Sequence, residues 1–259
     1  QRASGGVLLY GLPGTGKTYL TKALAAELAV PVFSLDPSTV LSKWLGDSEK
    51  HLAEIFRQAR AHPASLIFVD EVDALAPSRD GAGEGSQAMQ RLLAQLLAEL
   101  DGFAEKSGQL LFLGATNRPW DVDAALLRPG RFDALGYVDL PNHATRTELL
   151  RRRLEGIALE RKVDLVGIAK ALEDYSAAET VAVADQAARQ AFLDAVEKRR
   201  DRPVCEEDLR YAAMSVHRVA TPDMVARFQR FAEEHGLPPP GSFHQAAGEP
   251  GEIKVAGMA

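Results

Sequence analysis

Eight consecutive residues near the start of the chain have the pattern of a loop that binds a polyphosphate. They read GLPGTGKT over 11–18 and match G-x-x-x-x-G-K-[ST] at every fixed position. Glycines let such a backbone come close, so that N–H groups and a helix N-terminus point at the phosphates. Lys17 would neutralise the β- and γ-phosphates, and the Thr18 hydroxyl would bind Mg²⁺. A chance glycine-rich turn is the alternative. The residues predicted to contact a nucleoside triphosphate here are Pro13, Gly14, Thr15, Gly16, Lys17, Thr18 and Tyr19.

Two carboxylates follow an apolar run further along the chain. Residues 66–69 read as a buried strand, and Asp70 and Glu71 stand at its end. Because adjacent residues at a strand end point to opposite faces, the two acids should have different tasks. Asp70 would hold the metal and its hydration shell, and Glu71 would orient and deprotonate an attacking water. An acidic cap on the next segment is the alternative, but a pair of acids beside a phosphate loop favours hydrolysis of the triphosphate.

An asparagine and two arginines follow a third apolar run. Residues 110–115 end just before Asn117, at the edge where open parallel sheets bind ligands. Its amide could hold a water against the γ-phosphate, although a turn asparagine is the alternative. Arg128 and Arg131 lie on either side of a Pro-Gly turn. Arginine suits bidentate contact with phosphate oxygens, and we expect both arginines to reach the γ-phosphate bound by a neighbouring subunit.

The elements around these residues alternate in type as far as about residue 140. Apolar runs at 7–10, 31–36 and 136–140 read as further strands, and helical spacing follows the phosphate loop and recurs over 52–59. This alternation predicts an α/β fold, a parallel sheet flanked by helices on both sides. From Asn142 the pattern is helical, with a capping box at 176–179 and an N-cap followed by proline at 221–222.

These segments together resemble the AAA+ ATPases of the branch that contains valosin-containing protein, katanin, spastin and the ESCRT-disassembly ATPases. The likeness runs from Gly6 to about Gly236 and includes the segments GLPGTGKT, LIFVDEVDALAPSR, ELDGF and GATNRPWDVDAALLRPGRFD. It implies binding of ATP, ADP and Mg²⁺, a large nucleotide-binding domain over 1–141, a small helical lid over 142–236 and a flexible tail over 237–259.

The resemblance also gives tasks to single residues. Asn117 resembles the polar sensor, and Arg128 and Arg131 resemble arginine fingers that act in trans. The segment Asp101-Gly102-Phe103 resembles the one that signals nucleotide state between subunits.

The segment 41–49 resembles the first pore loop of ring-shaped unfoldases. Lys43, Trp44 and Leu45 would then contact a protein client. An ordinary half-buried tryptophan is the alternative. Elsewhere the chain departs from the family pattern, because Asp174 and Ala177 stand where the relatives have glycine. The second glycine lets the backbone approach the nucleotide base, so we expect the Ala177 methyl to weaken or reshape adenine binding.

Composition limits the classes of protein that fit. The 259 residues are 46% hydrophobic and 25% charged, and their net charge of −6 argues against nucleic acid as an obligate partner. No apolar run is long enough to cross a bilayer, and no signal peptide is visible. Cys205 is the only cysteine, which fits a reducing compartment such as the cytoplasm. Because the chain begins at Gln1, shortly before the first strand, we expect it to be part of a longer protein.

The sequence leaves three hypotheses about function. The first is an ATP-hydrolysing remodelling ATPase that assembles into a ring of six identical subunits and threads or unfolds protein clients. The second is a nucleotide-gated assembly scaffold or switch with little turnover, which Ala177 keeps open. The third, microtubule severing, rests only on the Lys43-Trp44 pair.

Overall fold

The computed structural model describes residues 5–37, 47–77, 86–103, 109–199 and 201–240. Within these residues the chain divides into two compact units, which are described separately. The first unit holds residues 5–11 and 17–138, and the second holds residues 12–16 and 139–240.

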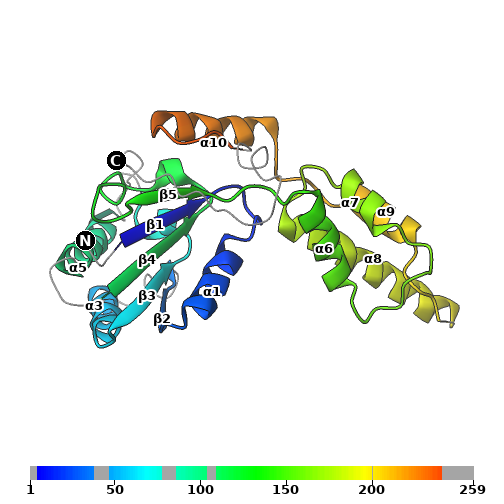
Figure 1. Ribbon diagram of the computed structural model, residues 1–259, viewed down its shortest axis with the longest axis horizontal. Helices are drawn as coiled ribbons and strands as arrows, with labels where there is room; N and C mark the ends of the chain where they lie inside the picture. Colours follow the sequence, from blue (N-terminus) through cyan, green and yellow to red (C-terminus); the bar gives the residue numbers. More distant parts are fainter. Residues whose placement is uncertain (1–4, 38–46, 78–85, 104–108, 200, 241–259) are drawn as a thin grey trace. The chain divides into compact units, whose positions relative to one another are not determined.

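The first unit is built on a parallel sheet (Figure 1). Within the described residues its strand order is β2-β3-β4-β1-β5, and every pairing is parallel. The strands are β1 Gly5–Tyr10, β2 Val32–Leu35, β3 Ala64–Val69, β4 Gln109–Thr116 and β5 Ala134–Tyr137. This confirms the predicted fold class.

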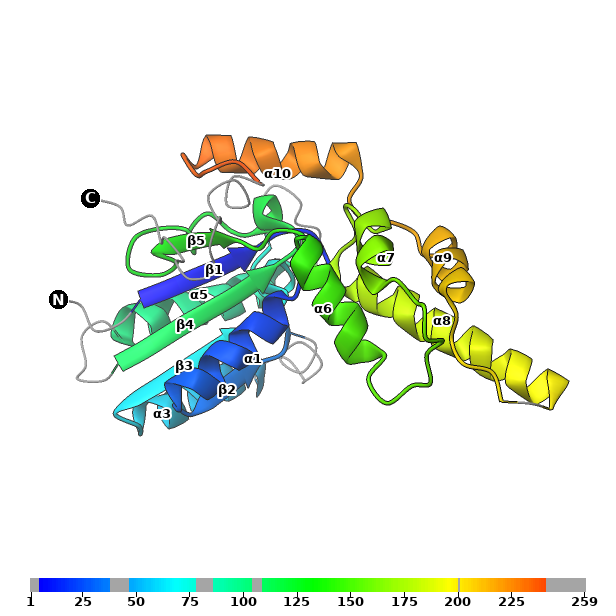
Figure 2. The ribbon, with the colours of Figure 1, turned by 45° about the vertical axis from the view of Figure 1, so that its right-hand side comes forward.

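Helices cover both faces of this sheet, and the alternation of side chains along β3 shows why. Ile67 and Val69 belong to a large apolar cluster with α3 (Asp47–Arg60), α4 (Val72–Leu75) and α5 (Ser86–Phe103), whereas Phe68 packs with Ala25 of α1 (Lys17–Leu28). Figure 2 shows α1 and α5 on opposite sides of the sheet. Residues 66–69 are thus buried on both faces, as their continuous apolar run predicts.

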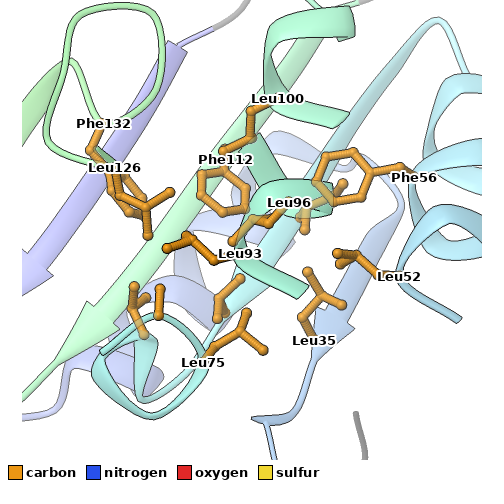
Figure 3. Close-up of a cluster of buried hydrophobic side chains, with 14 of the residues drawn as sticks. Leu35, Leu52, Phe56, Leu75, Leu93, Leu96, Leu100, Phe112, Leu126 and Phe132 are labelled. Carbon is orange, nitrogen blue, oxygen red and sulfur yellow. The ribbon is translucent and has the colours of Figure 1, made fainter. Parts of the chain in front are cut away.

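The larger cluster also anchors the segment that carries the two arginines (Figure 3). The ring of Phe112 on β4 lies between the rings of Phe56 and Phe132, with centroid distances of 6.5 and 5.0 Å. Burial of each such ring contributes about 1.5–3 kcal/mol. Phe132 and Leu126 are both buried, so the turn between them is fixed to the core.

Helix α1 buries one narrow face against the sheet. In α1 the buried residues are Lys17, Thr21 and Ala25, and Leu20 and Leu28 are half exposed. Beyond Lys17, the helix therefore buries the small side chains of Thr21 and Ala25, which allows close packing.

The bounds of the last strand, β5, differ from the predicted ones. It occupies Ala134–Tyr137 instead of 136–140. It pairs with β1, in which Tyr10 lies opposite Tyr137, so it ends where its partner ends.

The second unit is helical. It contains α6 His143–Arg153, α7 Leu165–Ala171, α8 Ala177–Lys198, α9 Glu206–Ser215 and α10 Pro222–Glu234. Its apolar core includes Leu150, Ile168, Val183 and Leu209 from four of these helices. The capping box before α8 and the N-cap of α10 form as predicted. None of the described helices is long and apolar enough to cross a membrane. Of the predicted tail, residues 241–259 lie outside the described residues.

Candidate functional site

The predicted chemical residues of the first unit follow three neighbouring strands at one edge of the sheet. Tyr10, the last residue of β1, lies opposite Thr116, the last residue of β4. Val69, the last residue of β3, pairs with Gly114 of β4. Parallel strands end at the same edge, so Gly11, Asp70 and Asn117 all leave the sheet there. We call this the carboxyl edge.

Lys17 is fixed at this edge by the glycine that opens the phosphate loop. A Cβ on Gly11 would lie 2.4 Å from the carbonyl oxygen of Val138, so this position has no room for a side chain. The Gly11 carbonyl accepts a hydrogen bond of 3.0 Å from Lys17 Nζ. Burial lowers the pKa of the Lys17 ammonium to about 8, against the opposing effect of Asp70 and Asp73. A buried ammonium with so little solvation is suited to a phosphate.

The two predicted metal ligands touch each other. Thr18 Oγ1 donates a hydrogen bond of 2.7 Å to Asp70 Oδ2, and the other Asp70 oxygen accepts from the Glu71 backbone N–H at 3.1 Å. A hydroxyl and a carboxylate are the hard oxygen donors that Mg²⁺ prefers, and Mg²⁺ is usually held by one or two protein groups together with phosphates. The residues present therefore fit a magnesium–nucleotide complex.

Glu71 has an unusual backbone. Its φ of 52° and ψ of 53° are left-handed, a conformation that costs a non-glycine residue about 1–3 kcal/mol and is common at functional positions. It lies immediately before α4, and its carbonyl accepts from the Ala74 N–H at 2.8 Å. Its side chain is exposed, so a water molecule can reach the carboxylate.

Asn117 stands between two fixed neighbours. The hydroxyl of buried Thr116 donates a hydrogen bond of 2.6 Å to Asp73 Oδ1 and accepts one of 2.9 Å from the Arg118 N–H. Asn117 itself is half-buried. The roles of Asp73 and Thr116 could not be predicted from the sequence, because an acid in the first turn of a helix ordinarily indicates only capping.

Residues 12–16 of the phosphate loop belong to the second unit. Gly14 and Gly16 have φ of +75° and +99°, which require glycine. The Gly14 carbonyl accepts from the Ala178 N–H at 3.0 Å, and a Cβ on Gly14 would lie 2.9 Å from Ser176 Oγ. No described atom lies within 4 Å of a Cβ built on Gly16, so its backbone is open to a ligand.

The other predicted nucleotide contacts are Pro13, Thr15 and Tyr19, which differ in exposure. Pro13 and Thr15 are half-buried, and Thr15 Oγ1 donates to the Leu12 carbonyl at 3.0 Å. The side chain of Tyr19, in the first turn of α1, is exposed.

The two positions that depart from glycine differ from each other. Asp174 keeps a left-handed backbone, with φ of 66°, although it has a side chain. Ala177 is the first residue of α8 and is half-buried, and its φ is not positive, so alanine suits this backbone. The expected effect of its methyl group on adenine binding stays a prediction.

The two arginines also differ. Arg128 is exposed. The Arg131 side chain is only 16% exposed, and its guanidinium donates to both oxygens of Asp101, at 3.2 and 3.0 Å, and to the Ala125 carbonyl at 2.7 Å. Hydrogen bonding from Arg131 lowers the pKa of Asp101. Arg131 is therefore held by its own chain.

Lys43, Trp44 and Leu45 lie outside the described residues. Their predicted contact with a protein client stays a prediction.

Several known proteins are similar to this chain in sequence. The sequence pattern of the family described as "ATPase family associated with various cellular activities (AAA)" matches residues 7–140. The chain is 39% identical over 235 residues to the ATPase family gene 2 protein of Saccharomyces cerevisiae, covering 89% of this chain. It is 41% identical over 202 residues to the cell division cycle protein 48 homolog of Archaeoglobus fulgidus, covering 78%. It is 42% identical over 206 residues to the proteasome-activating nucleotidase of Methanosarcina mazei, covering 74%.

The matched region is a part of each of these relatives. It spans 29% of the yeast protein, 27% of the Archaeoglobus protein and 49% of the Methanosarcina protein. These matches confirm the family resemblance that the sequence motifs indicate.

Proposed function

The chain belongs to the AAA family of ATPases, and on this premise we propose that it binds ATP with Mg²⁺ and hydrolyses it at the carboxyl edge of its sheet. The observation that carries the proposal is the contact of 2.7 Å between Thr18 and Asp70. This contact joins the start of α1 to the end of β3. The proposed metal-binding pair, Thr18 and Asp70, therefore lies directly beside the water-activating Glu71.

Each residue at the edge then has one task. Lys17 binds the phosphate oxygens through its desolvated ammonium, and Thr18 and Asp70 hold the metal. Bound Mg²⁺ supplies neutralisation of charge on the phosphate oxygens. Glu71 accepts the proton of the attacking water at its exposed carboxylate, and the Asn117 amide orients that water without adding charge.

The Glu71→Gln variant tests this assignment. It should bind ATP like the parent and release phosphate at least ~100-fold more slowly, because the amide cannot accept the proton. Glu27→Gln, which changes an exposed glutamate on α1 in the same way, should leave turnover unchanged. Loss of ATP binding in Glu71→Gln would contradict the assignment.

We also propose that the chain works in a ring of six copies in which Arg128 and Arg131 of one copy serve the site of the next. Head-to-tail contacts close into rings, and an arginine in trans can stabilise the transferring phosphoryl group. Mixing Arg131→Ala with Glu71→Gln subunits should restore some turnover, because some interfaces then pair an intact arginine with an intact glutamate. If co-assembled mixtures stay inactive, the trans arrangement is wrong.

Protein clients are the proposed substrates, with Lys43, Trp44 and Leu45 as the grip. An indole can hold an extended chain by apolar contact without a sequence code. Trp44→Ala should keep basal hydrolysis and lose its stimulation by an unfolded protein. A large fall in melting temperature would instead identify Trp44 as a core residue.

The free thiol of Cys205 fits a proposed location in the reducing cytoplasm.

The scaffold hypothesis keeps one observation in its favour. Arg131, one of the two predicted fingers, is bound to Asp101 of its own chain. A chain that kept this contact in a ring would bind nucleotide and assemble but turn over slowly. Phosphate release per subunit, measured against protein concentration, separates the two functions, since only the remodelling ATPase should show a steep rise on assembly.

A further inference from the structure

Hydrolysis at the carboxyl edge requires Glu71 and Asn117 to be held in a fixed relation. They follow different strands, β3 and β4, and a water molecule can be held by both only if their separation is kept within a narrow range. The structure shows what connects the two positions. The short helix α4 begins directly after Glu71 and packs against β4, which ends directly before Asn117.

The front of α4 is bonded to the end of β4 by a side-chain pair. Asp73, in the first turn of α4, accepts the hydrogen bond of 2.6 Å from Thr116. The same hydroxyl accepts from the Arg118 N–H, so both neighbours of Asn117 are tied through one oxygen atom. Thr116 is 1% exposed, which removes competition from water.

The back of α4 is fixed as well. The Ala76 carbonyl accepts from the Asp123 N–H at 2.9 Å, and Pro77 forms an antiparallel bridge with Val122. Val72 and Leu75 are buried in the core between these two attachments. With both ends held, the helix can sustain the left-handed backbone of Glu71, because strained residues persist only where their surroundings overdetermine them.

We infer that Asp73 and Thr116 form a positioning pair that sets Glu71 relative to Asn117 for activation of the attacking water. The inference rests on the proposed ATP hydrolysis and extends it to two residues that lie within the motif segments but had no task assigned to them. Neither residue is needed to hold phosphate or metal. The pair should therefore affect the rate of the chemical step and leave nucleotide affinity nearly unchanged.

Asp73 has a second possible task, because its charge acts on Lys17. Two substitutions separate the tasks. Thr116→Val removes the hydroxyl and keeps the charge of Asp73. Asp73→Asn removes the charge and keeps an oxygen that can accept from Thr116 Oγ1. Positioning predicts a loss in the first variant and near-normal turnover in the second, whereas a charge effect predicts the reverse.

The experiment measures kcat for ATP, Kd for ADP and the melting temperature of the full chain. Thr116→Val should lower kcat by roughly 10–100-fold, within the range for loss of water activation, and keep Kd within about threefold, as expected for a residue that touches no phosphate. Thr116→Ser, which retains the hydroxyl, should recover most of kcat. Thr147→Val is the matched control, since this buried α6 hydroxyl donates only to the His143 carbonyl.

Defined results overturn the inference. Parent-like kcat in folded Thr116→Val rejects the pair, and so does an equal loss of kcat and ADP affinity. If Thr116→Val does not fold, Asp73→Ala and Asp73→Asn at this half-exposed position are compared instead. Both remove the charge, but only Asp73→Ala removes the acceptor for Thr116 Oγ1, so positioning predicts a loss of kcat in Asp73→Ala alone. If the parent, Thr147→Val and Thr116→Val all hydrolyse ATP with the same kcat, the positioning pair is rejected and the proposed function stands. A parent chain without turnover at any concentration rejects that function, and the pair with it.

Discussion

The carboxyl edge of the sheet and the arginine turn, residues 125–133, are prepared for catalysis in opposite ways. At the edge the chemical groups are bonded to one another within the chain, through Thr18 with Asp70 and Thr116 with Asp73. In the turn, Arg128 is exposed and Arg131 is bound to Asp101 of helix α5. Under the proposed function, the groups for binding a metal nucleotide and activating water are thus held together within one chain.

Rigid anchoring makes this difference meaningful. The Phe132 N–H donates to the Leu126 carbonyl at 3.0 Å, and the Gly130 N–H donates to Asp133 Oδ1 at 2.6 Å. The backbone of the arginine turn is thus as well defined as that of the edge. Of the two arginines in this turn, Arg128 is the one left to solvent, which is what a group meant for another molecule requires.

Removing the exposed arginine should have the largest effect. Arg128→Ala should reduce phosphate release at saturating ATP by about 1,000-fold or more, as expected when a transition-state charge partner is lost, and keep ADP affinity within a few-fold. Arg151→Ala, an exposed arginine of α6, is the control. Retained turnover in Arg128→Ala would contradict the proposed contact of Arg128 with the γ-phosphate of the next subunit.

Removing the buried ammonium should affect binding instead. Lys17→Ala should weaken ATP affinity by roughly 100-fold, since a charge-assisted contact in a desolvated place is lost. Lys22→Ala, an exposed position on the same helix, should bind ATP like the parent. Titration with a fluorescent ATP analogue measures both. Unchanged affinity in Lys17→Ala would remove the basis for the phosphate loop.

The same ammonium predicts a pH dependence of nucleotide affinity. Phosphate favours the charged form of Lys17, so its pKa is higher in the complex than the value of about 8 in the free protein. Affinity for ADP without divalent cation should be level well below pH 8 and fall as pH rises through it, by at most about tenfold per unit. Calorimetry from pH 6.5 to 9.5 covers the window roughly. The Lys17→Ala variant should show no such fall.

The smallest effect should come from the aspartate that holds Arg131. Asp101→Asn should lower the free energy of unfolding by less than about 1 kcal/mol at neutral pH, because the Asp101 side chain is 60% exposed. The pKa of the Asp101 carboxyl is lowered in the folded protein, so its contribution to stability is lost as the pH falls through this folded-state pKa. The free energies of unfolding of parent and variant should therefore converge in acid. Denaturant melts at two pH values test this. Faster turnover of Asp101→Asn at low protein concentration would show that the Arg131–Asp101 contact competes with the contact of Arg131 with the nucleotide of the next subunit.

The sequence was sufficient for features that local pattern or a fixed motif determines. The continuous apolar run 66–69 predicted a strand buried on both faces, and the spacing of Ser176 and Glu179 predicted the start of α8. The phosphate loop and the two acids that follow β3 could be aligned at one edge, because parallel strands end together.

Features that depend on distant partners could not be predicted. Asp101 and Arg131 are 30 residues apart, and Asp73 and Thr116 are 43 apart, without any periodicity that joins them. The limits of β5 follow from its pairing with β1, and the buried face of α1 follows from the space above the sheet. In each case tertiary packing decided between local alternatives that were equally acceptable.

The left-handed backbone of Glu71 has a consequence for how this chain can evolve. A glycine there would adopt the same φ and ψ freely, and the strain relieved, about 1–3 kcal/mol, would exceed the entropy gained by the unfolded chain, about 0.4–1 kcal/mol. Selection for stability alone would therefore drift toward glycine and erase the carboxylate. Keeping a glutamate in that conformation is a mark of selection for activity at the expense of stability. Among copies of this domain that have lost turnover but still assemble, this is the position where substitution should appear first.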